Sequence, residues 1–421
     1  MLIRQQFPAL ALQDDGKPRL YFDNPGGTQV PNQVLIRMQH YLIRTNANHG
    51  GHFRTSQLSD GILQEAHEAM ADLLNAGSGK EIIFGPNMTS LTFAISRSLA
   101  HWFKPGDEII LTRMDHDGNV MPWLLMARDL NIKVKWLDFD PETCRYDLQQ
   151  LPGLLSDKVR LMAVNYASNA IGTINDIAAI SKLARVNGSL TYVDAVQYVP
   201  HGPTDVQALG CDFLVCSAYK FFGPHQGVLW GKPELLEKLP AYKVRPADDV
   251  PPGKFETGTQ SHEGQAGTLG ALDYLAWIGK TMAQEYHQRF KFPNSRRQLL
   301  HAALAAIKDY ELILSRKLIQ GLQAIPGVTV HGITDAAQLN DRVPTVSFTV
   351  DGMTPSLIAK KLGQQNIYVW DGHYYALEVI KKLGLQEDEG MVRVGAVHYN
   401  TTEEIDRLLG MLQQITSENK K

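Results

Sequence analysis

Short apolar runs alternate with longer helix-like stretches between about residues 80 and 232 of this 421-residue chain. The runs are rich in β-branched residues and read EIIFG, DEIILT, KVKWLDF, VRLMAVNY, LTYVDAV, CDFLVCS and GVLWG. Runs that are apolar throughout, with helices between them, are typical of parallel strands whose sheet is covered on both faces. The pattern therefore predicts an α/β fold with a mostly parallel sheet.

The remainder of the chain predicts a second, smaller unit. Residues 247–265 (ADDVPPGKFETGTQSHEGQ) are rich in Pro, Gly and polar residues and predict a crossing loop. Helical patterns follow over residues 266–282, 296–325 and 402–415, with the strand-like runs VTVHG, TVSFTV and MVRVGAV among them. We predict a large domain of residues 20–262, and a small α+β domain of residues 1–19 and 263–421 that includes an interdomain helix.

Composition narrows the class of protein. The chain is 44% hydrophobic and 20% charged, which is ordinary globular usage. A net charge of −3 with dispersed Lys and Arg provides no basic stripe, so we expect neither nucleic acid nor an anionic membrane as a partner. Three cysteines are too few for a disulfide framework, and no apolar stretch reaches the roughly 18 residues of a membrane span. We expect a cytoplasmic protein that acts on a small molecule.

Two charged residues stand at the ends of neighbouring apolar runs. Asp194 ends SLTYVD, and Lys220 follows CDFLVCSAY, 26 residues later (220 − 194 = 26). In open α/β sheets, ligands bind at the carboxyl ends of the strands. A lysine amine forms an imine with the aldehyde of pyridoxal 5'-phosphate, and an aspartate pairs with the pyridinium nitrogen of that cofactor. Taken alone, the two residues equally fit a buried ion pair without chemistry.

The segment FGPNMTSLTFAISRSLA has the features of a phosphate site. After a strand end and a Gly-Pro turn, Asn87, Met88, Thr89 and Ser90 open an apolar-periodic helix. The N–H groups at a helix start bind phosphate, and hydroxyl side chains there add hydrogen bonds. An ordinary capped helix has the same features, so the segment gains weight only together with its neighbours.

Three further polar side chains follow strand ends. His116 lies in ILTRMDHDGNVMPW, where an imidazole can stack on a flat ring and move protons or can simply be hydrogen-bonded. Asn169, in YASNAIGTI, offers an amide to a phenolate or a carboxylate, and Gln197 follows Asp194 closely enough to reach the same ring. Such convergence of five segments is harder to explain by structural roles alone than any single segment is.

Two segments near the termini have the features of a substrate site. LYFDNPGGTQVP places Gly26 and Gly27 where the backbone either approaches a substrate closely or only turns. RVGAVHYN places Arg393 on a strand, where its guanidinium is a natural bidentate partner of an amino acid carboxylate or forms a surface ion pair. In NANHGGHFRTS, His49 and His52 lack a third ligand at metal spacing. We therefore expect no metal, and interpret His52 as a substrate-mouth or subunit-contact residue.

These segments, in this order, resemble the class V aminotransferase group of fold-type I pyridoxal-phosphate enzymes, and within it the cysteine desulfurase and selenocysteine lyase branch. The resemblance covers residues 21–409 and is carried by YFDNPGGTQVP, DHDGNVMPW, SNAIGTI, VDAVQ, SAYKFFGP, FETGTQ and RVGAVHYN. It implies a large domain with a mostly parallel seven-stranded sheet, a smaller C-terminal α+β domain, and a homodimer with shared active sites that acts on an amino acid.

The resemblance also implies roles for individual residues. Lys220 is the imine-forming catalytic lysine, and His116 stacks on the cofactor ring. The other implied cofactor contacts are Asp194 at the pyridinium nitrogen, Gln197 at the ring oxygen, Thr89 and Ser217 at the phosphate, and Met88 and Tyr219 beside them. The implied substrate contacts are Asn169 and Arg393 at the carboxylate, with Gly27, His52 and Tyr375 nearby. Thr259, in FETGTQ, is implied to reach the phosphate of the partner subunit's cofactor.

The chain departs from the family pattern at the residue that forms the persulfide. Desulfurases carry a nucleophilic cysteine in a segment similar to RTGHHCA, whereas this chain has VWDGHYYALEV. Tyr375 stands at the cysteine position and Trp370 at the arginine position. A phenol with a pKa near ~10 does not replace a thiolate nucleophile. Tyr219 likewise stands where the family often has histidine.

This departure predicts a pyridoxal-phosphate enzyme that does not make persulfide. Because β-elimination needs no cysteine, we expect a carbon–sulfur lyase that acts on cysteine or an S-substituted cysteine. Transamination and epimerisation begin with removal of the same α-proton and remain the alternatives. A fold that binds the cofactor or a partner without turnover is a further alternative, although such a protein has no physical need of an imine-forming lysine.

Overall fold

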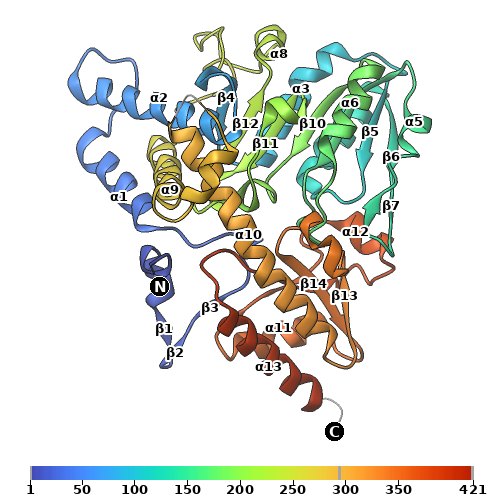
Figure 1. Ribbon diagram of the computed structural model, residues 1–421. Helices are drawn as coiled ribbons and strands as arrows, with labels where there is room; N and C mark the ends of the chain where they lie inside the picture. Colours follow the sequence, from blue (N-terminus) through green and yellow to red (C-terminus); the bar gives the residue numbers. More distant parts are fainter. Residues whose placement is uncertain (1, 293–294, 419–421) are drawn as a thin grey trace.

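A seven-stranded sheet forms the centre of the larger part of the molecule (Figure 1). The structure is a computed structural model that describes residues 2–292 and 295–418. In spatial order the strands are β4 (Ile82–Gly85), β12 (Gly227–Gly231), β11 (Phe213–Ser217), β10 (Leu190–Asp194), β9 (Val159–Asn165), β5 (Glu108–Thr112) and β6 (Lys133–Leu137). Strand β12 runs antiparallel to both of its neighbours, and the other pairings are parallel. The predicted mostly parallel sheet is confirmed, and each strand falls within one of the apolar runs.

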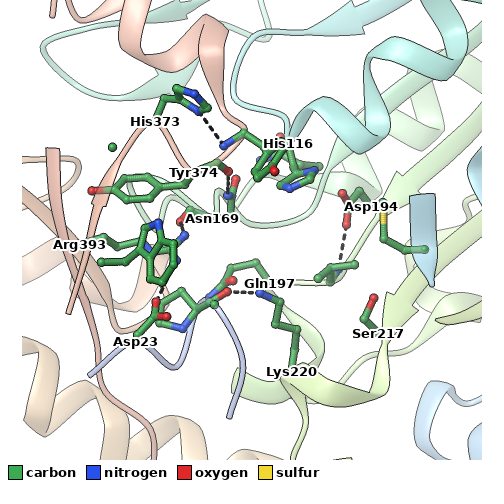
Figure 2. Close-up of a pocket in the computed structure, with 18 of the residues that line it drawn as sticks. Asp23, His116, Asn169, Asp194, Gln197, Ser217, Lys220, His373, Tyr374 and Arg393 are labelled. Carbon is green, nitrogen blue, oxygen red and sulfur yellow. Dashed lines mark hydrogen bonds and ion pairs between the residues drawn. The ribbon is translucent and has the colours of Figure 1, made fainter. Parts of the chain in front are cut away.

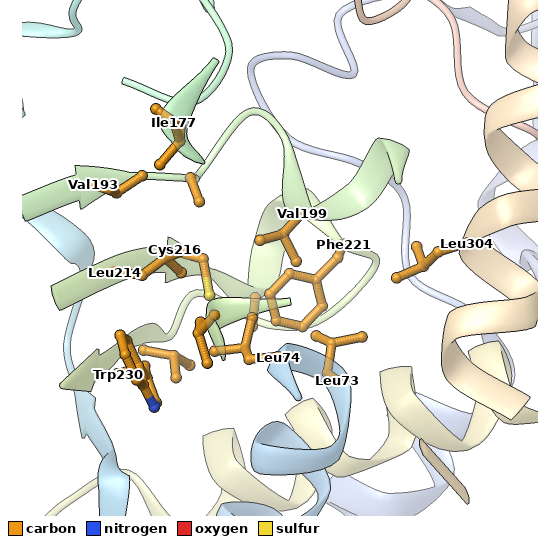
Figure 3. Close-up of a cluster of buried hydrophobic side chains, with 14 of the residues drawn as sticks. Leu73, Leu74, Ile177, Val193, Val199, Leu214, Cys216, Phe221, Trp230 and Leu304 are labelled. Atoms are coloured by element: carbon orange, nitrogen blue, oxygen red, sulfur yellow. The ribbon is translucent and has the colours of Figure 1, made fainter. Parts of the chain in front are cut away.

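Both faces of this sheet are buried except along the edge strand β6, and the other runs accordingly lack a polar alternation. Leu214 and Cys216 of β11 point into one apolar cluster, whereas Phe213 and Val215 point into another. The first cluster, part of which is drawn in Figure 3, is closed by α2 (Arg54–Leu74), α6 (Ile177–Asn187), α9 (His262–Thr281) and α10 (Ser295–Gln323). The second is closed by α3 (Met88–Leu99), α4 (Met121–Leu130) and α8 (Pro233–Lys238).

A smaller antiparallel sheet lies beyond the carboxyl ends of the large sheet's parallel strands (Figure 1). Its order is β13 (Val328–His331), β14 (Thr345–Val350), β17 (Met391–Gly395) and β16 (Trp370–Gly372). Helices α10, α11 (Pro355–Gly363) and α13 (Thr402–Glu418) supply the apolar side chains that pack on it. Three of these strands were predicted, whereas β16 was not. Trp370–Gly372 is short, polar in part and flanked by tyrosines, so its pairing with β17 is a product of tertiary packing.

Short elements join these parts. They are the helices α1 (Asn32–His40), α5 (Leu151–Leu154), α7 (Val206–Leu209) and α12 (Leu377–Lys382), and the strands β1 (Gln13–Asp14), β2 (Lys17–Pro18), β3 (Leu20–Tyr21), β7 (Phe139–Asp140), β8 (Arg145–Tyr146) and β15 (Ile367–Tyr368). Strand β3 pairs in parallel with β15, which brings the DNPGG segment beside the small sheet. The division into domains at residues 20 and 262 stays a prediction.

The loop predicted over residues 247–265 ends earlier than expected. Helix α9 begins at His262, because the side chain of Ser261 caps it by accepting a hydrogen bond from the Gly264 N–H at 3.2 Å. The polar SHEGQ stretch was therefore wrongly interpreted as loop. No helix among residues 2–292 and 295–418 is long and apolar enough to span a membrane.

Candidate active site

A cavity of about 610 Å³ lies between the carboxyl ends of the large sheet's parallel strands and the edge of the small sheet. Most of the predicted site residues line it, namely Met88, Thr89, His116, Asn169, Asp194, Gln197, Ser217, Tyr219, Lys220, Tyr375 and Arg393. Lys220, Asp194 and Ser217 enter from the large sheet, whereas Arg393 and Tyr374 enter from the opposite side (Figure 2). The structure thus brings together segments that are far apart in the sequence.

Lys220 follows β11 in a single 3-10 turn and is almost fully buried. Its Nζ donates a hydrogen bond to the carbonyl oxygen of Pro25. Burial and, to a lesser extent, the nearby Arg393 guanidinium lower the pKa of Lys220 to about 7, and Asp23 and Asp194 oppose this shift. Near neutral pH, Lys220 is therefore a neutral, nucleophilic amine in a large fraction of the protein molecules.

Asp194 is the last residue of β10, and it is buried beside Lys220 in the same cavity. Its Oδ1 accepts a hydrogen bond from the Val196 N–H at 2.9 Å. Burial raises the pKa of Asp194 to about 6, and the Val196 N–H and the charge of Lys220 oppose that rise. Among the described residues, this is the one hydrogen bond that the Asp194 carboxylate accepts. A cationic N–H group in the cavity would therefore stabilise the buried charge of this carboxylate.

His116 begins the turn after β5, and it is held as a neutral imidazole. Its Nδ1 accepts a hydrogen bond from the Gly118 N–H at 2.9 Å, which places the ring proton on Nε2. Burial lowers the pKa of His116 to about 4, and the positive charges of Lys220 and Arg393 act in the same direction. In this structure the imidazole stacks on the ring of Tyr375, with centroids 5.4 Å apart and an interplanar angle of 26°. Its predicted stacking on a cofactor ring stays a prediction.

Arg393, in β17, is buried and has contacts on several sides. Its Nη2 donates to Asp23 Oδ1 at 3.1 Å, its Nη1 donates to the carbonyl oxygen of Asn169 at 3.1 Å, and its Cζ lies 4.3 Å from the ring centroid of Tyr374. The sequence analysis missed Asp23. The signal for Asp23 was present, because it lies in the DNPGG motif, where only the glycines were considered.

The loop that carries Tyr374 and Tyr375 is held in an unusual backbone conformation. Both residues have positive φ angles, 54° and 57°, which bulky L-residues rarely adopt. The carbonyl oxygen of Tyr375 accepts a hydrogen bond from the Asp117 N–H at 2.6 Å, and that of Tyr374 accepts one from Asn169 Nδ2 at 2.8 Å. These contacts tie the loop to the segments of His116 and Asn169. The side chain of Tyr375 is 66% exposed at the cavity.

The polar lining suits a ligand that carries several hydrogen-bonding groups. Among the residues that the structure describes, four buried lining atoms have no hydrogen-bond partner: Asn169 Oδ1, Gln197 Oε1, Ser217 Oγ and Arg393 Nε. Buried polar atoms are rarely left unpaired, so a bound ligand is their expected partner. Asn169 Nδ2 already donates a hydrogen bond to the carbonyl oxygen of Tyr374. Of the two residues predicted to bind the substrate carboxylate, Asn169 and Arg393, we therefore expect Arg393 to be the donor.

The start of α3 is shaped for a phosphate. Asn87 caps the helix by accepting a hydrogen bond from the Ser90 N–H at 2.8 Å, and Met88 and Thr89 line the cavity. The first turn approaches the large sheet so closely that a Cβ on Gly227 would lie 2.4 Å from the Asn87 carbonyl carbon. The residues present therefore fit pyridoxal phosphate, with Lys220 and Asp194 at the ring and the start of α3 at the phosphate.

Three predicted residues do not line this cavity. Gly27 packs against Tyr219, where a Cβ would lie 3.2 Å from the tyrosine ring, whereas its neighbour Gly26 lines the cavity. The predicted contact of Gly27 with the substrate stays a prediction. His52 and Thr259 are exposed and are not among the residues that line the cavity. Their predicted contacts at a subunit boundary stay predictions.

None of the cysteines lies at the cavity. Cys144, Cys211 and Cys216 are buried, and Cys216 is packed among apolar side chains of the core (Figure 3). Burial raises the pKa of Cys211 to about 12 and raises that of Cys216 further, so both remain thiols at neutral pH. Among the described residues, the cavity lining includes no cysteine and no group of three or more metal-ligand side chains occurs.

The chain is similar to proteins of one family over nearly its whole length. A family model described as Aminotransferase class-V matches residues 20–297 and 295–408. An aminotransferase-like protein of Gibberella zeae is 34% identical, covering 98% of this chain and 97% of its own length. A probable cysteine desulfurase of Synechocystis is 33% identical, covering 98% of this chain and 94% of its own length.

A solved structure agrees with these matches. The apo cysteine desulfurase of Thermococcus onnurineus superposes with a TM-score of 0.86 at 27% identity, covering 99% of this chain and 98% of that chain. The expected family and its α/β fold are confirmed. The chain belongs to the class V aminotransferase family and is a pyridoxal-phosphate-dependent enzyme.

Proposed function

We propose that this enzyme binds pyridoxal 5'-phosphate in the Lys220 cavity and catalyses β-elimination from cysteine or an S-substituted cysteine. One observation carries the proposal: the cavity that holds the buried Lys220 and Asp194 has no cysteine in its described lining. By the family resemblance, Tyr375 stands where desulfurases have their nucleophilic cysteine. The relatives named as cysteine desulfurases support cysteine-derived substrates. Without a thiol in the described lining, we expect sulfur to leave into solution.

The lining residues have separate tasks in holding the cofactor. The Lys220 amine would bind its aldehyde carbon, Asp194 would pair with the ring nitrogen, and the His116 imidazole would cover the ring. Thr89 and Ser217 would hold the phosphate. When bound, the cofactor supplies an electron sink that makes the α C–H bond of an amino acid acidic.

The reaction then depends on where this chain holds the substrate and its protons. The free Nε of Arg393, together with the terminal N–H groups that Asp23 and Asn169 leave unused, would bind the α-carboxylate and orient the α C–H bond toward Lys220. The substrate's amino group would replace the Lys220 amine on the aldehyde carbon, which frees that amine to take the α-proton. The Cβ–S bond would then break with its electron pair leaving on sulfur. The three-carbon remainder hydrolyses to pyruvate and ammonia. Trp370 and Tyr375, both largely exposed, form an aromatic wall for the sulfur substituent.

The lowered pKa of Lys220 predicts the pH dependence of cofactor attachment to the apo protein. Only the neutral amine attacks the aldehyde, so the attachment rate rises with pH as the ammonium loses its proton. Because burial and Arg393 lower the pKa of Lys220 to about 7, we expect the midpoint of that rise near pH 7. Rapid-mixing absorbance measurements over about pH 5 to 10 test this, and a midpoint at the ordinary lysine pKa near ~10 would contradict it.

Transamination is the second candidate, because the similar protein of Gibberella zeae is named aminotransferase-like. Incubation with cysteine, S-substituted cysteines and a panel of other amino acids separates the two reactions. We expect pyruvate from the sulfur substrates without any amino acceptor. Turnover that requires a keto acid and returns a second amino acid would instead establish transamination.

A cytoplasmic homodimer is the assembly that we propose. Large apolar side chains are exposed between the start of α1 and the first turns of α2. They are Leu35, Ile36, Leu42, Ile43, Phe53 and Leu58. Exposed apolar side chains that gather in one region often mark a subunit contact. His52 lies within this region, and Thr259 precedes α9, which packs on α1. Both residues are therefore placed to contact a second subunit.

A further inference from the structure

A row of buried polar groups leads away from the cavity behind Gln197. Gln197 Nε2 donates to Thr345 Oγ1 at 2.9 Å and lies 3.4 Å from His201 Nε2. On the far side of the imidazole, His201 Nδ1 lies 2.7 Å from Glu311 Oε2. The side chains of His201 and Glu311 are only 5% and 2% exposed, and Glu311 lies in the middle of the interdomain helix α10.

The groups around Glu311 leave His201 as its proton-sharing partner. Its other oxygen, Oε1, accepts a hydrogen bond from the His398 N–H at 3.0 Å. Burial lowers the pKa of His398 to about 3, with His201 acting in the same direction, so His398 is neutral. Lys308 and Arg342 line the same small cleft, but no ion pair joins either to Glu311 within the described residues. Arg342 donates to backbone carbonyl oxygens instead.

The number of protons on the Glu311–His201 pair decides what His201 offers to Gln197. With one proton, held on Nδ1 between the two groups, Nε2 is an acceptor and requires the NH₂ end of the Gln197 amide. With a second proton, Nε2 becomes a donor and requires the amide oxygen. The Thr345 hydroxyl both donates and accepts, so it satisfies either end of the amide. With one proton on the pair, the amide oxygen of Gln197 therefore faces the cavity. With two protons, the NH₂ group faces it.

We propose that Glu311, acting through His201, sets which end of the Gln197 amide faces the cofactor's ring oxygen. In the structure the NH₂ end faces His201 and Thr345, and Oε1 is unpaired at the cavity. An amide oxygen facing the ring oxygen favours its protonated form, whereas an NH₂ group favours its anion. Glu311 is thus a positioning residue whose effect on the cofactor passes through Gln197. The inference rests on the proposed binding of pyridoxal phosphate in this cavity.

Packing alone does not account for the pair. Burying a carboxylate and an imidazole costs free energy that an apolar pair of the same size would avoid. Burial accordingly raises the pKa of Glu311, and the contact with His201 opposes that rise. His201 of the pair also contacts Gln197, which lines the cavity. The 3.4 Å between His201 Nε2 and Gln197 Nε2 is short enough for the amide to respond to the imidazole.

A double-mutant cycle read by absorbance tests the proposal. The cofactor-loaded protein is titrated with pH, and the midpoint between its visible and near-ultraviolet bands is compared for wild type, E311Q, Q197L and E311Q/Q197L. We expect E311Q to move the midpoint by at least about one pH unit, a tenfold change in the ratio of the two forms. In the Q197L background the same substitution moves it by less than about 0.3 units, because no amide remains to turn. H201Q is expected to shift the midpoint as E311Q does, which covers failure of E311Q to fold.

The contrary outcomes separate the explanations. Equal shifts with and without Gln197 would overturn the proposal, because Glu311 would then act through space. Unchanged midpoints in folded E311Q and H201Q would make the pair purely structural, while leaving the proposed function intact. A wild-type protein that never develops a visible band would overturn the cofactor assignment, and this inference with it.

Discussion

Replacing Lys220 with alanine is expected to abolish covalent cofactor attachment and to lower turnover by at least about a thousandfold. The variant loses both the amine that binds the cofactor aldehyde and the base that takes the α-proton. Borohydride reduction followed by mass spectrometry measures the attachment directly. We expect the cofactor mass on the wild-type peptide that contains Lys220, and none on that peptide in the variant.

Lys254 supplies the matched control for this substitution. It is as buried as Lys220, but its ammonium donates to the carbonyl oxygens of Leu236 and Glu237, and it does not line the cavity. Lys254→Ala is expected to lower the melting temperature while leaving borohydride labelling of Lys220 in place. Labelling that survives Lys220→Ala and disappears in Lys254→Ala would place the cofactor elsewhere.

Replacing Arg393 with lysine is expected to lower kcat/KM by about a hundredfold, mostly through a higher KM. Lysine keeps the positive charge but loses the planar fork and the stacking on Tyr374, whose ring centroid lies 4.3 Å from the guanidinium carbon. The loss corresponds to one or two charge-assisted hydrogen bonds to the substrate carboxylate. Steady-state kinetics with an S-substituted cysteine measures the effect on each constant.

Arg113 offers a closely matched control. It also stacks on an aromatic ring, 4.7 Å from the centroid of Trp136, and it pairs with Glu378, yet it does not line the cavity. Arg113→Lys is expected to leave KM within about twofold of wild type. If both variants raised KM equally, general destabilisation would explain the effect better than carboxylate binding does.

Much of the candidate site was predictable because it follows from strand ends. Asp194, Ser217 and Lys220 each end or follow an apolar run, and parallel strands place their carboxyl ends at one edge of a sheet. That single topological rule brings together segments that are well separated in sequence. The cap of α3 was predictable for a different reason, since local residues determine a helix start.

Other features depend on contacts that no local pattern encodes. The unusual backbone of Tyr374 and Tyr375 is fixed by hydrogen bonds from Asp117 and Asn169, two segments that lie far away in sequence. The short strand β16 exists because β17 offers it an edge. Glu311 lies within the helical pattern predicted over residues 296–325, and only the packing of α10 against the His201 segment reveals that it is buried. These features belong to the second layer around the site, where tertiary packing decides.

The central claim is that the enzyme catalyses β-elimination in this cavity without a thiol nucleophile. The most direct test of this claim is to follow the substrate's sulfur. Wild-type enzyme is incubated with ³⁵S-cysteine, and the radiolabel on protein, free sulfide, pyruvate and alanine are all quantified. We expect pyruvate and free sulfide in equal amounts, with no label on the protein. A labelled, reductant-sensitive persulfide on the protein, formed together with alanine, would contradict the claim.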